Sequence, residues 1–214
     1  MSWVLRLLGA TGLRTSGLLN NYVKPIWTHN QLRAWWRRGR PAPAPHGVKL
    51  ATILHWADLI GATTLVETGT FRGDTVRALR GRFDRLISIE LSPRLATPVV
   101  NEHRAFKNVE IVVGDSGAKL PQIAPSLTTP TIFWLDAHYS AGKTVGEGVV
   151  PVYRELAGAW ATSAPHVILI DDMRDFNGAN GYPTVEDLTA RFEAKAYKVF
   201  IANDILQAIP RTLL

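Results

Sequence analysis

Five apolar segments of the chain each end in an acidic residue, and this is the pattern in the sequence best suited to chemistry. The acids that close these segments are Glu67, Glu90, Asp115, Asp136 and the pair Asp171–Asp172. The steps from one to the next are 23, 25, 21 and 35 residues, about the length of one helix with its loops. Parallel strands end along one edge of their sheet, and ligands bind there. The spacing therefore predicts a row of carboxylates along one ligand cleft.

Carboxylates in a cleft need partners, because an unpaired buried charge costs several kcal/mol, as an order of magnitude. Hydroxyls, organic cations and metal ions are the partners that a ligand can supply. A second interpretation is that some of these acids cap the helix that follows, as Asp often does. Capping explains one or two of the acids more easily than it explains all five.

The first acid opens a loop with two glycines, residues 67–75, with the sequence GluThrGlyThrPheArgGlyAspThr. Glycine allows a tight turn and a close approach to a ligand, and the helix that follows offers its N-terminus. The loop lacks the GxGxxG pattern of nicotinamide-binding proteins. Its carboxylate would repel a diphosphate but not a sulfonium or an ammonium group, which favours S-adenosylmethionine over NAD. We predict cofactor contacts at Glu67, Thr68, Gly69, Thr70, Gly73 and Thr75.

Three further positions extend this cofactor site along the predicted edge. Glu90 closes the second strand, where a carboxylate can accept hydrogen bonds from both ribose hydroxyls. Asp115 and Ser116 close the third strand and are placed to meet an adenine edge. Asp136, at the end of the fourth strand, is expected beside the cofactor as well.

The elements that must position these residues alternate regularly. Strands are predicted over 63–68, 85–90, 109–113, 131–136, 167–171, 197–202 and 205–209. Helices are predicted over 48–60, 74–82, 93–104, 117–125, 149–162 and 184–195. Alternation of this kind predicts a parallel sheet with right-handed crossovers. The last two strands are too close for a crossover, so we expect an antiparallel hairpin around residues 203–204. The fold class is thus α/β, a Rossmann-like doubly wound sheet of about seven strands, mostly parallel, with an antiparallel C-terminal hairpin.

The charge of the chain is divided unevenly between two predicted regions. Residues 1–46 form an N-terminal extension that ends in the stiff linker ProAlaProAlaPro, and residues 47–214 form the main domain. Eight Lys and Arg and no acid lie within residues 1–57, whereas the remainder holds 16 basic and 18 acidic residues. A nucleic-acid site would gather its basic residues near the cleft, so we expect no nucleic-acid partner. The chain has no cysteine, which excludes thiolate metal sites and disulfides and agrees with a cytoplasmic location.

The extension itself combines Trp and Leu with scattered Arg, at positions that include Trp3, Trp27, Trp35 and Trp36. Basic and aromatic residues on an amphipathic segment suit a membrane interface or a partner surface, which would place the protein at the inner membrane face. The alternatives are packing on its own domain, a homo-oligomer contact, or an organelle transit peptide. No run of about 18 apolar residues is present, so we expect no spanning helix.

Residues 48–210 resemble a class I S-adenosylmethionine-dependent methyltransferase. The resemblance rests on the loop at 67–73, on Glu90 and on GlyAspSer at 114–116, which match the family's glycine loop, ribose acid and adenine-contacting turn. Within that family the chain is similar to metal-dependent O-methyltransferases of the catechol and macrolide-sugar kinds. The segments around Asp136 and Asp171–Asp172 also resemble a little-characterised bacterial group associated with polysaccharide-modifying enzymes.

The resemblance implies a divalent cation held by Asp136, Asp171 and Asp172. Three carboxylates without Cys form an oxygen-rich site, which suits Mg²⁺ or Mn²⁺. The chain departs from the family three residues beyond Asp136, where the usual catalytic lysine is replaced by Tyr139. We predict His138 as the general base, because its reference pKa is near neutrality, with Tyr139 and Lys143 as second choices.

The predicted function is S-adenosylmethionine-dependent O-methylation, assisted by a divalent metal and by Asp136 and His138 as catalytic residues. The acceptor is expected to be a hydroxyl of a sugar, a glycan or a related small molecule. Two alternatives stay open. One is a non-catalytic binding or scaffold protein that keeps the fold, and the other is a nicotinamide-dependent oxidoreductase.

Overall fold

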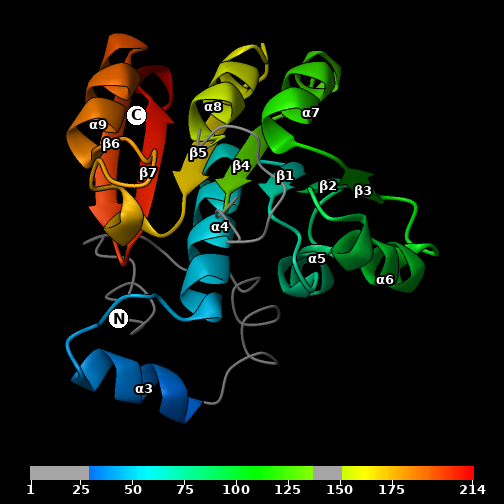
Figure 1. The fold of residues 1–214 in the computed structure, drawn as a ribbon, viewed down its shortest axis with the longest axis horizontal. Helices are drawn as coiled ribbons and strands as arrows, with labels where there is room; N and C mark the ends of the chain where they lie inside the picture. The colour runs from blue at the N-terminus through cyan, green and yellow to red at the C-terminus, as the bar shows by residue number, and fades with distance from the viewer. Residues whose placement is uncertain (1–28, 137–150) are drawn as a thin grey trace.

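The structure, a computed structural model, describes residues 29–136 and 151–214. Its centre is a seven-stranded sheet with the strand order β3-β2-β1-β4-β5-β7-β6 (Figure 1). Strands β1 to β5 pair in parallel, and β7 runs antiparallel between β5 and β6. The strands are β1 (Thr64–Thr68), β2 (Arg85–Glu90), β3 (Val109–Val113), β4 (Thr131–Leu135), β5 (His166–Ile170), β6 (Tyr197–Ala202) and β7 (Ile205–Pro210). The fold class expected from the sequence is confirmed.

Strand bounds follow the apolar runs closely. Strands β2, β3 and β6 begin and end where the sequence predicts, and the other four differ by one residue at one or both ends. The reason is burial: every residue of β1, β4 and β5 is buried, so these strands need apolar or hydrogen-bonded side chains on both faces.

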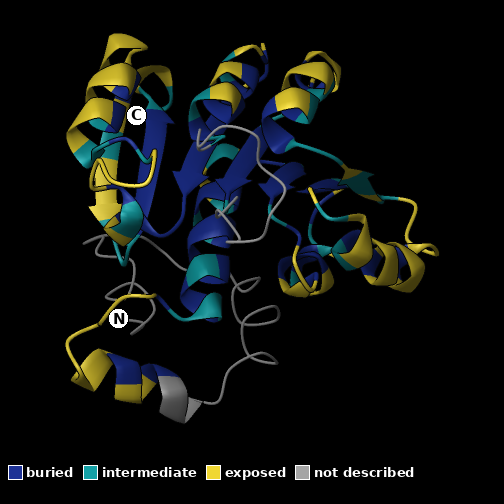
Figure 2. Cartoon of the chain, viewed as in Figure 1, coloured by how far each residue is buried: buried dark blue, intermediate teal, exposed yellow. Residues whose placement is uncertain are grey.

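Helices cover both faces of the sheet. They are α3 (His29–Arg37), α4 (His46–Ile60), α5 (Asp74–Leu79), α6 (Pro93–His103), α7 (Ser116–Ile123), α8 (Val152–Trp160) and α9 (Val185–Ala194), with short 3-10 turns η2 (Ala124–Ser126), η3 (Met173–Asp175) and η4 (Arg211–Leu213). One apolar cluster joins α4 and α5 to one face, and a second joins α7, α8 and α9 to the other. Figure 2 shows the central strands of the sheet as buried, whereas the edge strands β3 and β6 are partly exposed. The predicted helix over 149–162 is observed as α8, and its first two residues lie outside the described ranges.

The C-terminal hairpin turns at Asn203 and Asp204, which have φ of 57° and 67°. Two successive residues in the left-handed region make the tight turn whose twist matches that of the flanking strands. Asn and Asp tolerate this conformation better than other non-glycine residues. The turn also brings Asp204 back to the end of β5, where it meets Arg174.

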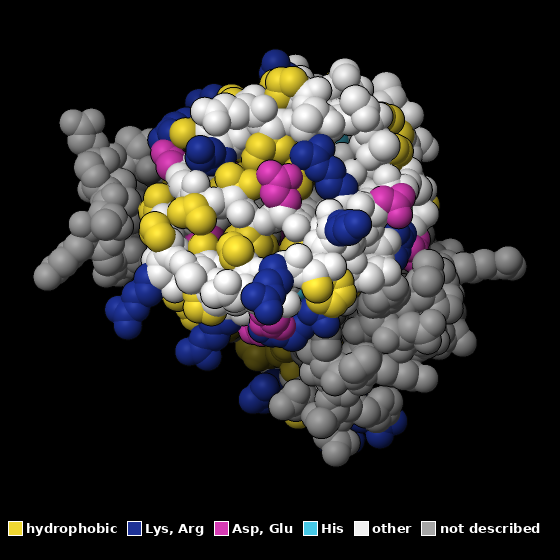
Figure 3. Space-filling model, turned by 90° about the vertical axis from the view of Figure 1, so that its right-hand side faces the viewer, with side chains coloured by type: hydrophobic (Ala, Val, Ile, Leu, Met, Phe, Trp, Pro, Cys, Tyr) yellow, Lys and Arg dark blue, Asp and Glu magenta, His cyan; other side chains and the backbone are white. Residues whose placement is uncertain are grey.

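Several charged side chains on the side of the molecule that carries β3 and α6 form ion pairs. Arg77 bonds both Asp74 and Glu102, and Arg85 lies 3.5 Å from Glu110. On the face that Figure 3 shows, basic, acidic and hydrophobic side chains are interspersed. The visible surface therefore resembles an ordinary solvated face, and its arginines do not form one continuous stripe.

The C-terminal part of the extension packs on the main domain. Leu32 and Trp35 of α3 are buried in a small cluster with Ala44 and Val48, and the Trp35 indole donates to the Pro41 carbonyl at 2.8 Å. Residues 1–28, with Trp3 and Trp27, lie outside the described ranges. No helix within residues 29–136 or 151–214 is long and apolar enough to cross a membrane.

Candidate active site

The strand order brings the predicted acids to one edge of the sheet. Read along that edge, the acids come in the order Asp115, Glu90, Glu67, Asp136 and Asp171, from the ends of β3, β2, β1, β4 and β5. Each acid therefore follows the next along the edge, although up to 69 positions separate neighbours in the chain. The row predicted from spacing alone is present in the fold.

The glycine loop leaves β1 at Thr68 and enters α5 at Asp74. Gly69 and Gly73 have φ of 86° and 75°, a conformation that favours glycine. A Cβ at Gly73 would lie 2.7 Å from Val99 Cγ1, so the loop also needs glycine there to pack on α6. Thr70 is held by a 2.6 Å hydrogen bond between its hydroxyl and that of Ser88. The loop is thus fixed in shape without a ligand.

Glu90 fastens this loop to the second strand. One of its carboxylate oxygens accepts from the Phe71 N–H at 2.8 Å, and the other accepts from the Ser92 N–H at 2.9 Å. Phe71 has φ of 49° and is 57% exposed, so the bond holds a residue in an uncommon conformation with its ring turned outward. Each oxygen keeps a second lone pair, which leaves Glu90 able to accept from a ribose as predicted.

Glu67 is buried beneath the loop rather than exposed on the edge. It accepts a 2.5 Å hydrogen bond from Ser88 and interacts with the Thr75 hydroxyl. Burial raises its pKa from 4.5 to about 8, and hydrogen bonds from Ser88 and Thr75 offset only part of that effect. The carboxyl is therefore largely protonated at neutral pH and acts as a link between β1, β2 and α5. Its predicted contact with the cofactor stays a prediction.

This buried carboxyl gives a test of the fold's pH dependence. The folded protein keeps a proton on Glu67 that the unfolded chain releases near pH 4.5, so stability from this group is full below pH 4.5 and is lost by about pH 8. Glu67→Gln should therefore become more stable relative to the natural protein as the pH rises through this window, on the order of a few kcal/mol. Chemical denaturation at several pH values measures the difference. Glu110→Gln, at an exposed position, should give a flat difference, and parallel curves for Glu67→Gln would contradict the assignment.

The third strand leads into α7 through Asp115 and Ser116. Asp115 is the N-cap of α7, accepting from Gly117 N–H at 2.9 Å, and also pairs with Arg154 at 2.7 Å. The capping interpretation therefore holds for this acid. Ser116 donates to Glu155 of α8, a buried carboxyl whose pKa is raised to about 7 by burial.

Glu155 was not predicted from the sequence. It lies on α8 and contacts residues at the start of α7 and at the end of β1. Besides Ser116 it interacts with the Thr68 hydroxyl, whose oxygen accepts from the Asp136 N–H at 3.3 Å. The side chains of Thr68 and Ser116 are thus engaged with a buried acid, and their roles toward the cofactor stay predictions. One acid within an amphipathic helix gives no sequence signal of such a contact.

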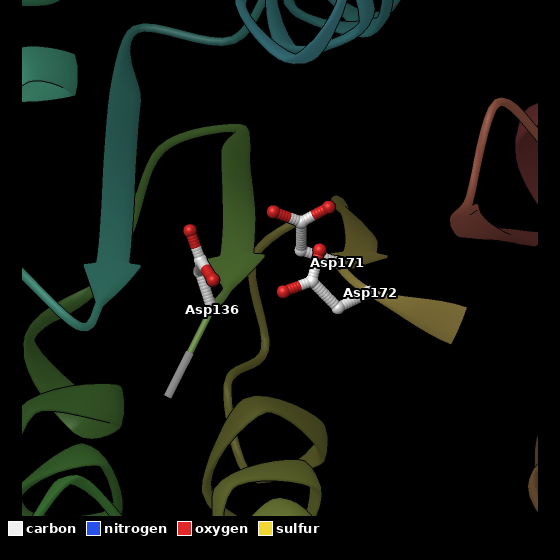
Figure 4. Close-up of side chains that lie close together, drawn as sticks. All are labelled: Asp136, Asp171 and Asp172. Atoms are coloured by element: carbon white, nitrogen blue, oxygen red, sulfur yellow. The ribbon is translucent and has the colours of Figure 1, made fainter. Parts of the chain in front are cut away.

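Asp136, Asp171 and Asp172 gather at the acceptor end of the edge (Figure 4). One carboxylate oxygen from each lies within 4.8 Å of the other two. Asp171 is 1% exposed, and its Oδ1 has no hydrogen-bond partner among the described residues. Burial raises the pKa of Asp171, and the nearby charges of Asp136 and Asp172 raise it further. A positive charge close to the three acids would stabilise their ionised forms.

A bend in the backbone makes this cluster possible. Successive side chains of a strand point to opposite faces, so two adjacent acids can share one site only where the chain leaves the extended conformation. Asp172 has φ of 55°, in the left-handed region, directly after β5. Arg174 holds it there: its guanidinium donates to Asp172 Oδ1 at 2.6 Å and also bonds Asp204 of the hairpin turn.

Two residues at the start of α4, His46 and Lys49, also lie in this site, and neither was predicted as a site residue. Lys49 forms a hydrogen-bonded ion pair with Asp171 Oδ2 and lies 3.6 Å from Asp172 Oδ1. Burial on its own lowers the pKa of Lys49, but attraction to Asp171 and Asp136 outweighs it and the pKa is raised. His46 interacts with the backbone of Asp74, its pKa is lowered by burial, and its Nε2 is buried without a partner among the described residues. A His and a Lys three residues apart in the first turn of a mostly apolar helix were the available signal.

The predicted bases His138, Tyr139 and Lys143 lie outside the described ranges. Strand β4 ends at Leu135, and Asp136 follows it between Thr68 and the end of β5.

The donor set fits a divalent cation. Ligands on opposite sides of one Mg²⁺ are about 4.2 Å apart, close to the spacing of these oxygens. Asp171 Oδ1, buried and without a partner among the described residues, is a carboxylate oxygen left available for such an ion. Hard oxygen donors suit Mg²⁺ or Mn²⁺.

No protein-family model and no curated protein sequence matches the chain. Solved structures do match it in shape. An O-methyltransferase from Bacillus cereus in complex with SAH has a TM-score of 0.55 and 16% identity, over 97% of this chain and 95% of that one. The O-methyltransferase TomG from Streptomyces achromogenes, in complex with SAM, has a TM-score of 0.54 and 16% identity, over 98% of this chain and all of its own.

The similar structures also include the 23S rRNA methyltransferase ErmE, with a TM-score of 0.52 and 17% identity, over 78% of this chain and 69% of that one. Enzymes with different acceptors therefore share this shape. What they have in common with the chain is the sheet 3-2-1-4-5-7-6 and the helices on its two faces. At these identities the likeness establishes the fold, and the chain has the fold of the class I S-adenosylmethionine-dependent methyltransferases.

Proposed function

We propose that the protein is an S-adenosylmethionine-dependent O-methyltransferase that methylates a hydroxyl of a sugar or a related small molecule with the help of Mg²⁺ or Mn²⁺. The observation that carries the proposal is the cluster of Asp136, Asp171 and Asp172 at the same sheet edge as Glu90 and the glycine loop. A ligand bound by Glu90 and the loop would then have its reactive end near the acids. The O-methyltransferases among the similar structures support this choice of acceptor atom.

Different residues along the edge of the sheet would bind different parts of the ligands. The glycine loop binds the amino-acid end of the cofactor, Glu90 the ribose, and the turn at Asp115 the adenine. A divalent cation held by the three aspartates would act as a Lewis acid that orients the acceptor hydroxyl and lowers its pKa. Much of the rate can come from holding acceptor and cofactor in line.

The proposed reaction is a displacement at the methyl group of the cofactor. The bond between the sulfonium sulfur and its methyl group breaks, a bond from the acceptor oxygen to that methyl forms, and the hydroxyl proton passes to a base. His138 is the proposed base, with Tyr139 and Lys143 as alternatives, all in the segment outside the described ranges. The products are the methyl ether and S-adenosylhomocysteine.

Calorimetric titration with S-adenosylmethionine is the first test, because cofactor binding separates the hypotheses. We expect binding, followed by methyl transfer when glycans and sugar nucleotides are screened as acceptors with radiolabelled cofactor. Binding without transfer to any acceptor would favour the scaffold alternative. Failure to bind S-adenosylmethionine at millimolar concentration, together with binding of NAD, would favour an oxidoreductase.

The basic extension is proposed to hold the protein against an anionic lipid surface. The apolar side of α3 is occupied by packing of Leu32 and Trp35, so its outward side is the basic one. Arg33 and Arg37 lie one turn apart and are exposed, and Arg40 stacks 5.1 Å from the centre of the Trp36 ring.

Reversal of two charges on α3 should therefore weaken membrane binding. Each basic residue near an anionic surface contributes about 1 kcal/mol, so Arg33→Glu with Arg37→Glu should lower vesicle affinity at least about 30-fold. Co-sedimentation with phosphatidylserine-containing vesicles at low salt measures this. Arg191→Glu with Lys195→Glu, an equally spaced exposed pair in the last turn of α9 and at its C-cap, is the matched control. Equal losses in both double variants, or no binding by the natural protein, would contradict the proposal.

A further inference from the structure

Lys49 lies in the site, but none of the roles predicted for the cofactor, the metal or the base involves it. It lies in the first turn of α4, and its ammonium reaches the end of β5, 122 residues further along the chain, to pair with Asp171. The side chain is 16% exposed, so this is a largely buried ion pair inside the acid cluster. The contact places a positive charge where the three carboxylates converge.

Within residues 29–136 and 151–214, Lys49 and Arg174 are the cations that pair with the cluster, and they are held very differently. Arg174 is fixed between Asp172 and Asp204, and its own backbone N–H also donates to Asp204 at 2.8 Å. Lys49 is bonded to one oxygen of Asp171 and lies further from Asp172, at 3.6 Å. Lysine carries its charge on a flexible four-carbon stem, whereas the arginine fork is rigid. Lys49 is therefore the cation that can leave, and Arg174 the one that stays.

A divalent ion and the Lys49 ammonium compete for the same cluster of carboxylates. Lys49 bonds Asp171 Oδ2, and Oδ1 of the same carboxylate is the oxygen available to the ion. An ion shared by Asp136, Asp171 and Asp172 would lie about 2.1 Å from each oxygen. The ammonium already occupies the Asp171 Oδ2 side of that space, and two positive charges so close would repel strongly in a poorly solvated site. Both cannot be bound in these positions together.

We propose that Lys49 neutralises the acid cluster in the metal-free protein and is displaced when a divalent cation binds. Without a metal ion, the Lys49 ammonium reduces the repulsion among the three carboxylates. Because the ion must displace this ammonium, the affinity for the metal is lower than three carboxylates alone would give. This inference rests on the metal role in the proposed function, and it assigns Lys49 as a positioning residue rather than a catalytic one.

Mn²⁺ binding followed by electron paramagnetic resonance tests the exchange directly. Lys49→Met removes the competing charge and should bind Mn²⁺ at least about 10-fold more tightly than the natural protein. Lys49→Arg, which keeps the charge, should stay close to the natural affinity or bind more weakly. Lys107→Met is the matched control, because Lys107 is exposed in the turn before β3, at the opposite end of the strands.

A second measurement uses the metal-free proteins. In EDTA, thermal unfolding of Lys49→Met should occur at a lower temperature than for the natural protein, because three carboxylates then lack their cation. Saturating Mn²⁺ should remove most of that difference. If Lys49→Met does not fold in EDTA, Lys49→Gln, which keeps a hydrogen-bond donor, replaces it in both experiments. In the natural protein, the Lys49 Cε nuclear magnetic resonance should shift on addition of Mg²⁺.

The outcomes separate the exchange from the proposed function. Equal Mn²⁺ affinity in the natural protein and Lys49→Met, with no shift of the Lys49 resonance, would overturn the exchange and leave the metal role standing. Absence of Mn²⁺ binding in both proteins would overturn the exchange and the metal role together. Cofactor binding measured by calorimetry would still decide the methyltransferase proposal on its own.

Discussion

Glu90→Ala is expected to weaken S-adenosylmethionine binding about 10- to 150-fold, which corresponds to about 1.5–3 kcal/mol for charge-assisted hydrogen bonds. The carboxylate is only 7% exposed, and both of its oxygens already accept backbone N–H groups from Phe71 and Ser92. Its loss would therefore remove the ribose contacts and release the glycine loop at once. Isothermal calorimetry with S-adenosylmethionine and S-adenosylhomocysteine measures the change.

The two contributions can be separated with a cofactor analogue that lacks the ribose 2′-hydroxyl. The analogue should bind the natural protein more weakly than S-adenosylmethionine does, and the two ligands should bind Glu90→Ala about equally. Glu110→Ala on the neighbouring strand β3, where the acid is exposed, should leave affinity unchanged. An unchanged dissociation constant for Glu90→Ala would contradict the assignment of the ribose to this residue.

The positions of the strands along the chain could be predicted because the relevant signal is local. Runs such as residues 131–135 and 166–170 are buried on both faces, and continuous apolar sequence is what such strands require. The acids at their ends stand out for the same reason, since each interrupts an apolar run. The hairpin followed from the short connection at Asn203–Asp204, which left no room for a crossover.

The contacts that complete the site could not be predicted in the same way, because each joins residues far apart in the chain. Lys49 is 122 positions from Asp171, and Ser116 is 39 positions from Glu155. Lys49 was counted only as one of the eight Lys and Arg of residues 1–57, a region without any acid. Only the packing of α4 across the sheet shows that its first turn faces the acid cluster.

Asp115 and Asp136 follow the same sequence pattern but have different structural roles. Asp115 caps α7 and pairs with the half-exposed Arg154, so its charge is satisfied locally at the surface. Asp136 follows β4 and joins a second pair of acids from β5. The pattern of an acid after an apolar run does not distinguish these cases. The register of neighbouring strands does, because it decides which acids meet.

Asp171→Asn is expected to lower kcat about 1000-fold while leaving the affinity for S-adenosylmethionine within about 2-fold of the natural protein. The metal's stabilisation of developing charge is worth several kcal/mol, and each 1.36 kcal/mol changes the rate tenfold. Asparagine keeps the size of the side chain and one oxygen acceptor, but it removes the charge that binds the cation. Asp175→Asn, at a half-exposed acid in the same turn, is the matched control and should keep full activity.

Chelation should reproduce the effect of this substitution. EDTA should abolish turnover by the natural protein, added Mn²⁺ or Mg²⁺ should restore it, and neither treatment should change the residual rate of Asp171→Asn. The two treatments act on one step, so their effects should not add. Full turnover in EDTA would contradict the metal-assisted mechanism and leave His138 as the only proposed activator of the hydroxyl. In that case Lys49 would be the permanent cation of the cluster, and Lys49→Met should lose stability that no metal restores.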